Sequence, residues 1–265
     1  MKKYQAYGCA LIFSVLYTIH SPVKWKPVMT LQSIDFEPKS AEELLRWSMD
    51  QYGLEAGLAS SFGMEDMVLI DMIAKLGGPI TLFTLDTGRL HEETYEIMER
   101  VRSNYGLEIK NYFPDHNEVE RLVRQKGFFS FRESVENRKE CCRIRKVEPL
   151  NRALGELKAW VTGLRREQGV TRTDIPKVME DPDHPPLIKI NPLAEWTQEQ
   201  VATYIEKHNV PVNALHKKNY PSIGCAPCTR AIEPGEDIRA GRWWWENPEH
   251  KECGLHQRNA GLSEQ

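Results

Sequence analysis

Short apolar segments alternate with amphipathic segments along most of this 265-residue chain. The apolar segments at 54–59, 80–85, 108–112, 159–162 and 187–190 have the length of buried strands. The segments between them have the length and the apolar spacing of helices. This alternation predicts an α/β fold, in which a parallel sheet with right-handed crossovers is flanked by helices.

Capping residues predict where several helices begin. Ser40 and Glu43 match a capping box before the first helix, and Thr197 with Gln200 matches one before the last clear helix. The other helices are expected at 67–76, at 91–105, from a cap at Asn117 to about Gly127, and from Cys141 to about Leu154. The polar, proline-bearing segment 171–186 is expected to be a mobile loop.

Residues 1–28 are expected to lie outside the folded protein. They begin Met-Lys-Lys and continue as an uncharged run, which superficially resembles a secretory signal. The run is short for a membrane span, and no small-x-small cleavage site follows it. We interpret the segment as a disordered extension, or as the product of a start codon upstream of Met29, and we assign no role to Cys9.

Charge and cysteine usage narrow the possible functions. The formal net charge of −3 gives no reason to expect a nucleic-acid partner. Six cysteines in a chain of this size, most of them clustered, point to metal or redox chemistry in a reducing compartment such as the cytoplasm.

Three polar loops follow predicted strands, at 60–66, 86–88 and 163–166. Ligands of open α/β sheets bind at the carboxyl ends of the strands, so one crevice could collect all three loops. Ser60, Ser61 and Gly63 at a helix N-terminus suit a phosphate or sulfate, although an ordinary turn can have the same composition. The loop lacks the lysine of a Walker motif.

The other two loops carry weaker indications. Asp86 and Thr87 could accept a hydrogen bond from a ribose or a base amine, or could simply cap the next helix. Arg165 and Arg166 could bind a phosphate through paired guanidinium groups, or could be solvated surface residues.

Four cysteines form two unusual pairs, Cys141 next to Cys142 and Cys225 two residues before Cys228. A disulfide is disfavoured inside a cell, while zinc and an iron–sulfur cluster both accept four thiolates. Zinc sites normally use spaced cysteine knuckles, so the adjacent pair favours a cluster without excluding zinc.

Cys253 lies in a hydrophilic segment near the chain end, where it should be exposed and mobile. A cationic pocket would lower the pKa of such a thiol, and Arg239 and Arg242 could supply that charge or could be solvated. The tryptophans at 243–245 are expected to pack the tail onto the core; a base-stacking platform is the alternative.

The motifs CCRIRKVEPL, SIGCAPCT, EDIRAGRWWW and KECGLH together resemble the assimilatory adenylylsulfate (APS) reductases of the APS/PAPS reductase family. LDTGRL, RREQ and PLAEWTQEQV fit the same pattern, and the likeness runs from about Met29 to His256. It implies an adenine-nucleotide α-hydrolase-like (Rossmann-like) fold. The domains would then be an extension at 1–28, a nucleotide-binding and iron–sulfur domain at 29–234, and a catalytic tail at 235–265.

The resemblance also implies roles for individual residues. One 4Fe-4S cluster per chain would be ligated by Cys141, Cys142, Cys225 and Cys228, and Cys253 would be the nucleophile. Lys146 would link cluster and substrate. The residues expected to bind the substrate are Ser60, Ser61, Gly63, Asp86, Thr87, Lys146, Arg165, Arg166, Arg239, Arg242 and His256.

The implied activity is reduction of APS to sulfite and AMP through an S-sulfocysteine on Cys253, in assimilatory sulfate reduction. Thioredoxin or a similar dithiol would be the reductant, and the cluster would act electrostatically. No nucleic-acid or membrane partner is expected, and a homo-oligomer is possible. The alternatives are a PAPS or dual-substrate reductase, an adenylating ATP pyrophosphatase, whose Ser-Gly-Gly-x-Asp-Ser loop the segment 60–66 departs from, and a non-catalytic metal module.

Overall fold

The computed structural model describes residues 34–168 and 172–247. Every element below belongs to the compact unit that begins at Phe36. The predictions for residues 1–28, the start at Met29, Cys9, Cys253 and His256 concern residues outside the described ranges. Across those ranges, no helix is both long enough and apolar enough to span a bilayer.

A six-stranded sheet in the order β3-β2-β1-β4-β6-β5 forms the centre of this unit. Its strands are β1 Ala56–Ala59, β2 Thr81–Leu85, β3 Ile109–Tyr112, β4 Ala159–Val161, β5 Val178–Glu180 and β6 Ile188–Ile190. Every pairing except that of β5 with β6 is parallel. The α/β prediction with a parallel sheet is therefore confirmed, and all five predicted strands are present.

The strand β5 corrects the expectation of a loop over 171–186. It pairs antiparallel with β6 at the sheet edge, with Met179 opposite Lys189. Asn191 supports it from the next segment, because its backbone N–H donates to the Lys177 carbonyl and its side chain donates to the Pro176 carbonyl. A strand of three residues is too short to show a periodic apolar pattern, so no sequence feature indicated it.

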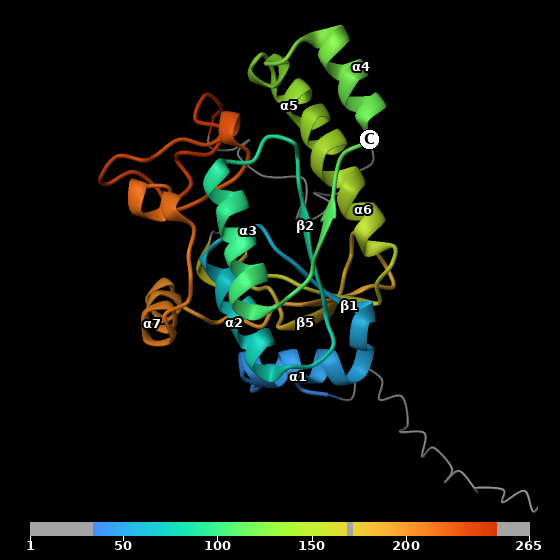
Figure 1. Cartoon of the computed structure of the whole chain (residues 1–265), viewed down its shortest axis with the longest axis vertical. Coiled ribbons are helices and arrows are strands. Elements are labelled where there is room, and N and C mark those ends of the chain that lie inside the picture. The colour runs from blue at the N-terminus through green and yellow to red at the C-terminus, as the bar shows by residue number, and fades with distance from the viewer. Residues whose placement is uncertain (1–33, 169–171, 248–265) are drawn as a thin grey trace, which may run out of the picture. The chain divides into compact units, whose positions relative to one another are not determined.

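Seven α-helices flank the sheet in the described part of the chain. They are α1 Ala41–Tyr52, α2 Met64–Leu76, α3 Glu92–Tyr105, α4 His116–Lys126, α5 Val135–Cys142, α6 Glu148–Leu154 and α7 Gln198–His208. Both predicted capping boxes are confirmed: the Ser40 hydroxyl accepts from the Glu43 N–H, and the Thr197 hydroxyl from the Gln200 N–H. In Figure 1, α5 and α6 run on as one rod, with α4 beside it.

Three helix starts were predicted at the wrong residue. The helix expected at 67–76 begins at Met64. Asp115, not Asn117, caps α4, because its carboxylate accepts from the Glu118 N–H at 3.1 Å. Cys141 does not open a helix either. Ser134 caps α5, and Cys141 with Cys142 ends it.

A π-helix, Arg143–Val147, separates α5 from α6. Its backbone closes a wide turn in which the Glu148 N–H donates to the Arg143 carbonyl, five residues back. Such wide turns recur at functional sites because they rotate side chains away from the regular helical positions. The turn contains Lys146, for which the family resemblance implied a functional role.

One face of the sheet packs against α6. Phe83 and Trp160 from the strands form a buried cluster with Leu150, Ala153 and Leu154 from the helix. Strand alternation places Leu58 and Leu82 on the opposite face. The sheet is thus covered on both sides, and its open side for ligands is the edge where the strands end.

Candidate active site

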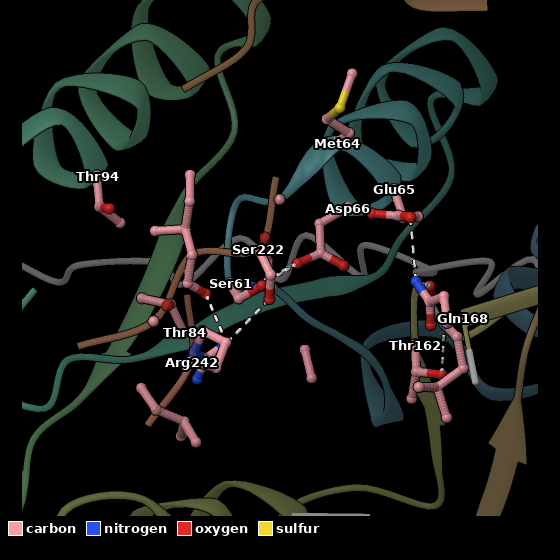
Figure 2. Close-up of a pocket in the computed structure, with 18 of the residues that line it drawn as sticks. Ser61, Met64, Glu65, Asp66, Thr84, Thr94, Thr162, Gln168, Ser222 and Arg242 are labelled. Carbon is pink, nitrogen blue, oxygen red and sulfur yellow. Dashed lines mark hydrogen bonds between the residues drawn. The ribbon is translucent and has the colours of Figure 1, made fainter. Parts of the chain in front are cut away.

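A cavity of about 450 Å³ lies at the carboxyl ends of β1, β2 and β4. It collects all three polar loops that the sequence placed there, and Ser60, Ser61, Gly63, Thr87 and Arg165 line it. The cavity is therefore the predicted crevice, and Figure 2 shows its walls.

The loop between β1 and α2 is held by hydrogen bonds within itself and to the first turn of α2. The Asp66 carboxylate accepts from the Ser61 N–H at 2.6 Å and from the Ser61 hydroxyl at 2.9 Å. The Ser60 hydroxyl accepts from the N–H of Phe62, whose φ of 58° is unusual for a residue with a side chain. Two of the predicted phosphate-binding hydroxyls are thus already engaged within the loop.

The carboxylates of Glu65 and Asp66 form an acidic wall of the cavity. Burial, with a smaller contribution from the charge of Glu65, raises the pKa of Asp66 to about 6, although the Ser61 hydrogen bonds oppose the shift. Gly163 allows this close packing, since a Cβ there would lie 2.6 Å from Asp66 Oδ1 and 3.0 Å from Glu65 Cβ.

The two adjacent arginines after β4 have different surroundings. Arg165 lines the cavity but is buried, and its guanidinium contacts Glu65, Glu167 and Gln198. Arg166 lies outside the cavity lining and pairs with Glu37 and Glu195. The geometry gives no support for Arg166 as a substrate ligand, and the charge of Arg165 is balanced by carboxylates.

Asp86 also lies outside the cavity lining. Its carboxylate accepts from the Gly88 N–H at 2.8 Å and from the Tyr95 hydroxyl at 3.0 Å. This geometry matches the turn-stabilising alternative that the sequence left open. Thr87, next to it, does line the cavity.

Cationic side chains line another part of the cavity. Lys146 comes from the π-helix, and Arg239 and Arg242 come from the segment that follows the Cys-x-x-Cys pair. Arg242 donates to the Ser222 hydroxyl at 3.2 Å and to the Ile223 carbonyl at 3.3 Å, a contact visible in Figure 2. Gly224 lets the backbone approach this guanidinium, because a Cβ there would collide with it.

Arg172 lines the cavity as well and donates to Gln168 Oε1 at 2.6 Å. Sequence reasoning missed it, because it lies in the segment that was interpreted as a mobile loop. A third arginine close after the adjacent pair at 165–166 was the available indication.

All four predicted cluster cysteines line a second, much smaller cavity. Cys141 and Cys142 reach it from the end of α5, and Cys225 and Cys228 from the two ends of a short 3₁₀ turn. None of them forms a disulfide with another described cysteine. The structure thus brings together two pairs that are more than 80 residues apart in the sequence.

The thiols in this cavity resist ionisation. Burial raises the pKa of Cys228 to about 12, and the three other cysteines act in the same direction. Burial also raises the pKa of Cys141. Thiols in such a site become thiolate ligands only when a metal displaces their protons.

Five basic side chains surround these thiols: Arg89, Arg138, Arg145, Lys146 and Arg242. Arg145 donates to the Thr87 carbonyl at 2.7 Å, which fixes its position beside the cysteines. In the described ranges, no three histidine, cysteine, aspartate or glutamate side chains are arranged to hold a single metal ion.

The two cavities share part of their lining. Lys146, Cys225 and Arg242 contribute to both. The Cys225 thiol also donates to the Thr87 hydroxyl at 3.3 Å, across the boundary between them. A charge in the small cavity would therefore act at short range on a ligand in the large one.

The segment 243–246, which follows Arg242, is anchored beside the cysteine cavity. Arg138 donates to both carboxylate oxygens of Glu246 at 2.9 and 3.0 Å, and it also lies over the Trp243 ring. Trp243 is buried, and Trp245 packs against Phe131. The prediction that these tryptophans pack the tail onto the core is confirmed for Trp243 and Trp245.

Comparisons with known proteins identify the family of the chain. The sequence pattern of the phosphoadenosine phosphosulfate reductase domain matches residues 55–231. An adenosine 5'-phosphosulfate reductase of Burkholderia cepacia is 56% identical over 198 residues, which is 75% of this chain and 79% of that protein. The protein of that name from Allochromatium vinosum is 55% identical over 200 residues, with 76% and 78% covered.

A solved structure supports the fold. The phosphoadenylyl-sulfate (PAPS) reductase from Candida auris superposes with a TM-score of 0.63 at 29% identity, covering 73% of this chain and 91% of that one. The fold is therefore of the adenine-nucleotide α-hydrolase-like kind that the resemblance implied. From sequence, fold and site alike, this chain belongs to the phosphoadenosine phosphosulfate reductase family and is an oxidoreductase.

Proposed function

We propose that this protein reduces adenylylsulfate to sulfite and AMP in sulfate assimilation, with thioredoxin or a similar dithiol as reductant. One observation carries the proposal. Lys146, Cys225 and Arg242 line both the nucleotide-sized cavity and the cysteine cavity. A site that binds a nucleotide next to a group of thiols suits a reductase, and it has no evident use in an adenylating pyrophosphatase.

The residues of the small cavity fit a 4Fe-4S cluster. The cavity offers four thiols, which is the ligand set of such a cluster. The five basic side chains around it would offset the negative charge of four thiolates. When bound, the cluster would supply a fixed local charge, and Cys141, Cys142, Cys225 and Cys228 would hold it.

The cationic wall suits the phosphosulfate of the substrate. Lys146, Arg239 and Arg242 would bind its oxygens and stabilise the charge that develops on AMP as it leaves. The apolar part of the cavity, with Phe83 and Trp160, would hold the base.

Cys253 would supply the nucleophile. Glu246, fixed by Arg138, precedes it by seven residues, a length of chain that spans up to about 25 Å. Its thiolate would attack the sulfur of the substrate, forming a sulfur–sulfur bond as the sulfur–oxygen bond to the phosphate breaks. AMP would leave with the electron pair of that bond.

The dithiol would complete the cycle. One of its thiolates attacks Cys253 Sγ, and sulfite leaves with the electrons of the sulfur–sulfur bond. The second thiol then displaces Cys253, so the dithiol ends as a disulfide and has supplied both electrons. Because Cys253 must stay reduced between turnovers, we expect the protein to work in a reducing compartment such as the cytoplasm.

The acidic wall favours APS over PAPS. PAPS carries a further phosphate on its ribose, and the Glu65 and Asp66 carboxylates would repel a second phosphate nearby. A PAPS or dual-substrate reductase is the second candidate, and Arg172, close to this wall through Gln168, is the observation that favours it.

An anaerobic assay of purified protein tests the proposal. With thioredoxin, APS should give sulfite and AMP with a much higher kcat/KM than PAPS. Without the dithiol, one SO₃ group per chain should accumulate on the peptide that contains Cys253, and Cys253→Ser should bind AMP yet release no sulfite. Release of pyrophosphate from ATP, an adduct on Cys225, or turnover by Cys253→Ser would each contradict the mechanism.

A further inference from the structure

His216 lies on the 3₁₀ helix Ala214–Lys218, and its protonation pattern follows from one contact. Its Nδ1 lies 2.8 Å from the carbonyl oxygen of Tyr220. A carbonyl oxygen only accepts, so Nδ1 carries the hydrogen and donates it. Burial lowers the pKa of the imidazole, although Tyr220 and Glu65 oppose the shift. The neutral ring therefore leaves a lone pair on Nε2.

That lone pair faces an unusual environment. Nε2 is buried and has no hydrogen-bond partner among the described residues. His216 lines the cavity of about 450 Å³. A buried acceptor left without a donor costs free energy, and in native proteins such atoms usually meet a ligand or an ordered water.

The position of the ring is fixed before any ligand binds. Asn213 accepts from the Leu215 N–H at 3.0 Å, and its amide donates to the Thr94 hydroxyl at 3.2 Å. These bonds hold the 3₁₀ helix against α3. A preorganised acceptor loses little entropy when a donor arrives.

A second histidine provides a comparison within the same structure. His91 occupies the N-cap position of α3, and its ring makes an edge-to-face contact with Tyr220, with the ring centroids 5.7 Å apart. Its Nε2 is also buried and without a partner in the described ranges, and burial lowers its pKa. His91, however, does not belong to the cavity lining, so only His216 presents its acceptor to a ligand there.

The residues that line the cavity indicate which part of the ligand donates a hydrogen bond to His216 Nε2. The cations Lys146, Arg239 and Arg242 suit the phosphosulfate, and the apolar residues suit the base. His216 and Glu65 line the same cavity, and the Glu65 charge opposes the lowering of the His216 pKa. The part of an adenylate that offers uncharged O–H donors is the ribose.

We infer that His216 Nε2 accepts a hydrogen bond from a ribose hydroxyl of the bound adenylate, which makes His216 a specificity-determining residue. This inference rests on the proposed function. The two hydroxyls share the same chemistry, and their separate removal distinguishes them.

The test measures calorimetric affinities for AMP, 2′-deoxy-AMP and 3′-deoxy-AMP. His216→Asn is the informative variant, because its amide can keep the bond to the Tyr220 carbonyl while nothing replaces Nε2. Wild type should bind one deoxy analogue about tenfold more weakly than AMP. His216→Asn should bind AMP about tenfold more weakly and should no longer discriminate against that analogue.

Three further variants test whether the acceptor at Nε2 causes the preference for AMP. His216→Gln, whose amide reaches the Nε2 position, should restore part of the preference for AMP. His216→Phe, which keeps a ring without an acceptor, should behave like His216→Asn. His91→Phe is the matched control and should discriminate as wild type does. Thermal melting of each variant identifies one that does not fold.

Two results would overturn the inference while leaving the proposed function intact. One is a His216→Asn protein that keeps the wild-type preference for AMP over both deoxy analogues. The other is a His216→Asn protein that keeps this preference but no longer distinguishes AMP from purine riboside monophosphate, which lacks the amine of the base. That result would assign Nε2 to the base. Failure of wild type to bind AMP at all would contradict the proposed function itself.

Discussion

The two cavities differ in the kind of backbone that builds them. The substrate cavity lies where consecutive parallel strands end, so the sheet topology alone brings its loops together. The cysteine cavity is built from irregular segments: the end of α5, the π-helix Arg143–Val147, a 3₁₀ turn and the segment around Trp243.

The two cavities also differ in charge. Glu65, Asp66 and Glu167 line the substrate cavity together with its cations. The cysteine cavity has five basic side chains in its described lining and no carboxylate. The first can therefore distinguish the ends of a polar ligand, while the second is suited to concentrated negative charge. Lys146 and Arg242 belong to both, which couples a charge in one to a ligand in the other.

The largest expected effect is a loss of bound iron and sulfide, which should follow substitutions in the cysteine cavity and not in the substrate cavity. Cys142→Ser or Cys228→Ser removes one ligand from the cysteine cavity alone, so anaerobically prepared protein should lose the roughly four iron and four sulfide per chain expected of a thiolate-bound cluster. Ser61→Ala in the substrate cavity and Cys9→Ser should both retain them. Elemental and sulfide analysis measures this. Zinc without sulfide in the wild-type protein would show that the four thiols hold a different metal.

A smaller effect tests how the cysteine cavity is closed. Arg138 and Glu246 form an ion pair with only 1% and 4% of their side chains exposed. Glu246→Ala should lower the free energy of unfolding by about 3–5 kcal/mol, because it removes the carboxylate that pairs with the buried Arg138 guanidinium. Urea unfolding measures the change.

The surface pair of Lys158 and Glu55 is the control for this experiment, since its side chains are 65% and 53% exposed. Lys158→Ala should change the unfolding free energy by less than about 1 kcal/mol. Equal effects at the two pairs would mean that the segment around Glu246 does not stabilise the cysteine cavity.

The same difference between the cavities explains what could be predicted from sequence. The crevice followed from apolar strands and polar loops, because a parallel sheet brings its strand ends together whatever the details. The cysteine set came from family resemblance, and the residues alone left zinc open. Its backbone was predicted wrongly: the apolar spacing of α6 was extended back to Cys141, and nothing in the sequence marks the π-helix that places Lys146.

The adjacent residues Arg165 and Arg166 show a second limit of prediction from sequence. Arg165 and Arg166 look equivalent in sequence, yet one is buried among Glu65, Glu167 and Gln198 and the other pairs with Glu37 and Glu195. The 3₁₀ turn Arg166–Gln168 sends them in different directions. Partners as distant in sequence as Glu65 and Glu37 cannot be assigned without the fold.

Asp66 gives a pH-dependent test of the acidic wall. Burial raises its pKa from the usual 3.8 to about 6 in the folded protein. Between these values the unfolded chain is already ionised while the folded protein still holds the proton. The free energy of unfolding of the wild type should therefore fall by about 3 kcal/mol in total as the pH rises through this window. Above pH 6 it should not recover, because Asp66 is then ionised in both states.

Asp66→Asn removes this titration, and its amide oxygen can still accept from Ser61. The stability of the variant relative to wild type should increase by up to about 3 kcal/mol between pH 4 and pH 7.5. Urea unfolding at both pH values measures it. A difference that does not change with pH would mean that Asp66 ionises normally and that the wall is more hydrated than its burial indicates.

The smallest effect lies at the boundary that the two cavities share. Thr87 is buried, and its hydroxyl accepts from the Cys225 thiol and from the Arg89 N–H, both at 3.3 Å. Thr87→Val preserves the shape but removes the acceptor, so the free energy of unfolding should fall by about 1 kcal/mol. Thr87→Ser keeps the hydroxyl and loses only a methyl group. If the serine variant loses as much stability as the valine variant, packing and not the hydrogen bond joins the strand-end loop to the cysteine turn.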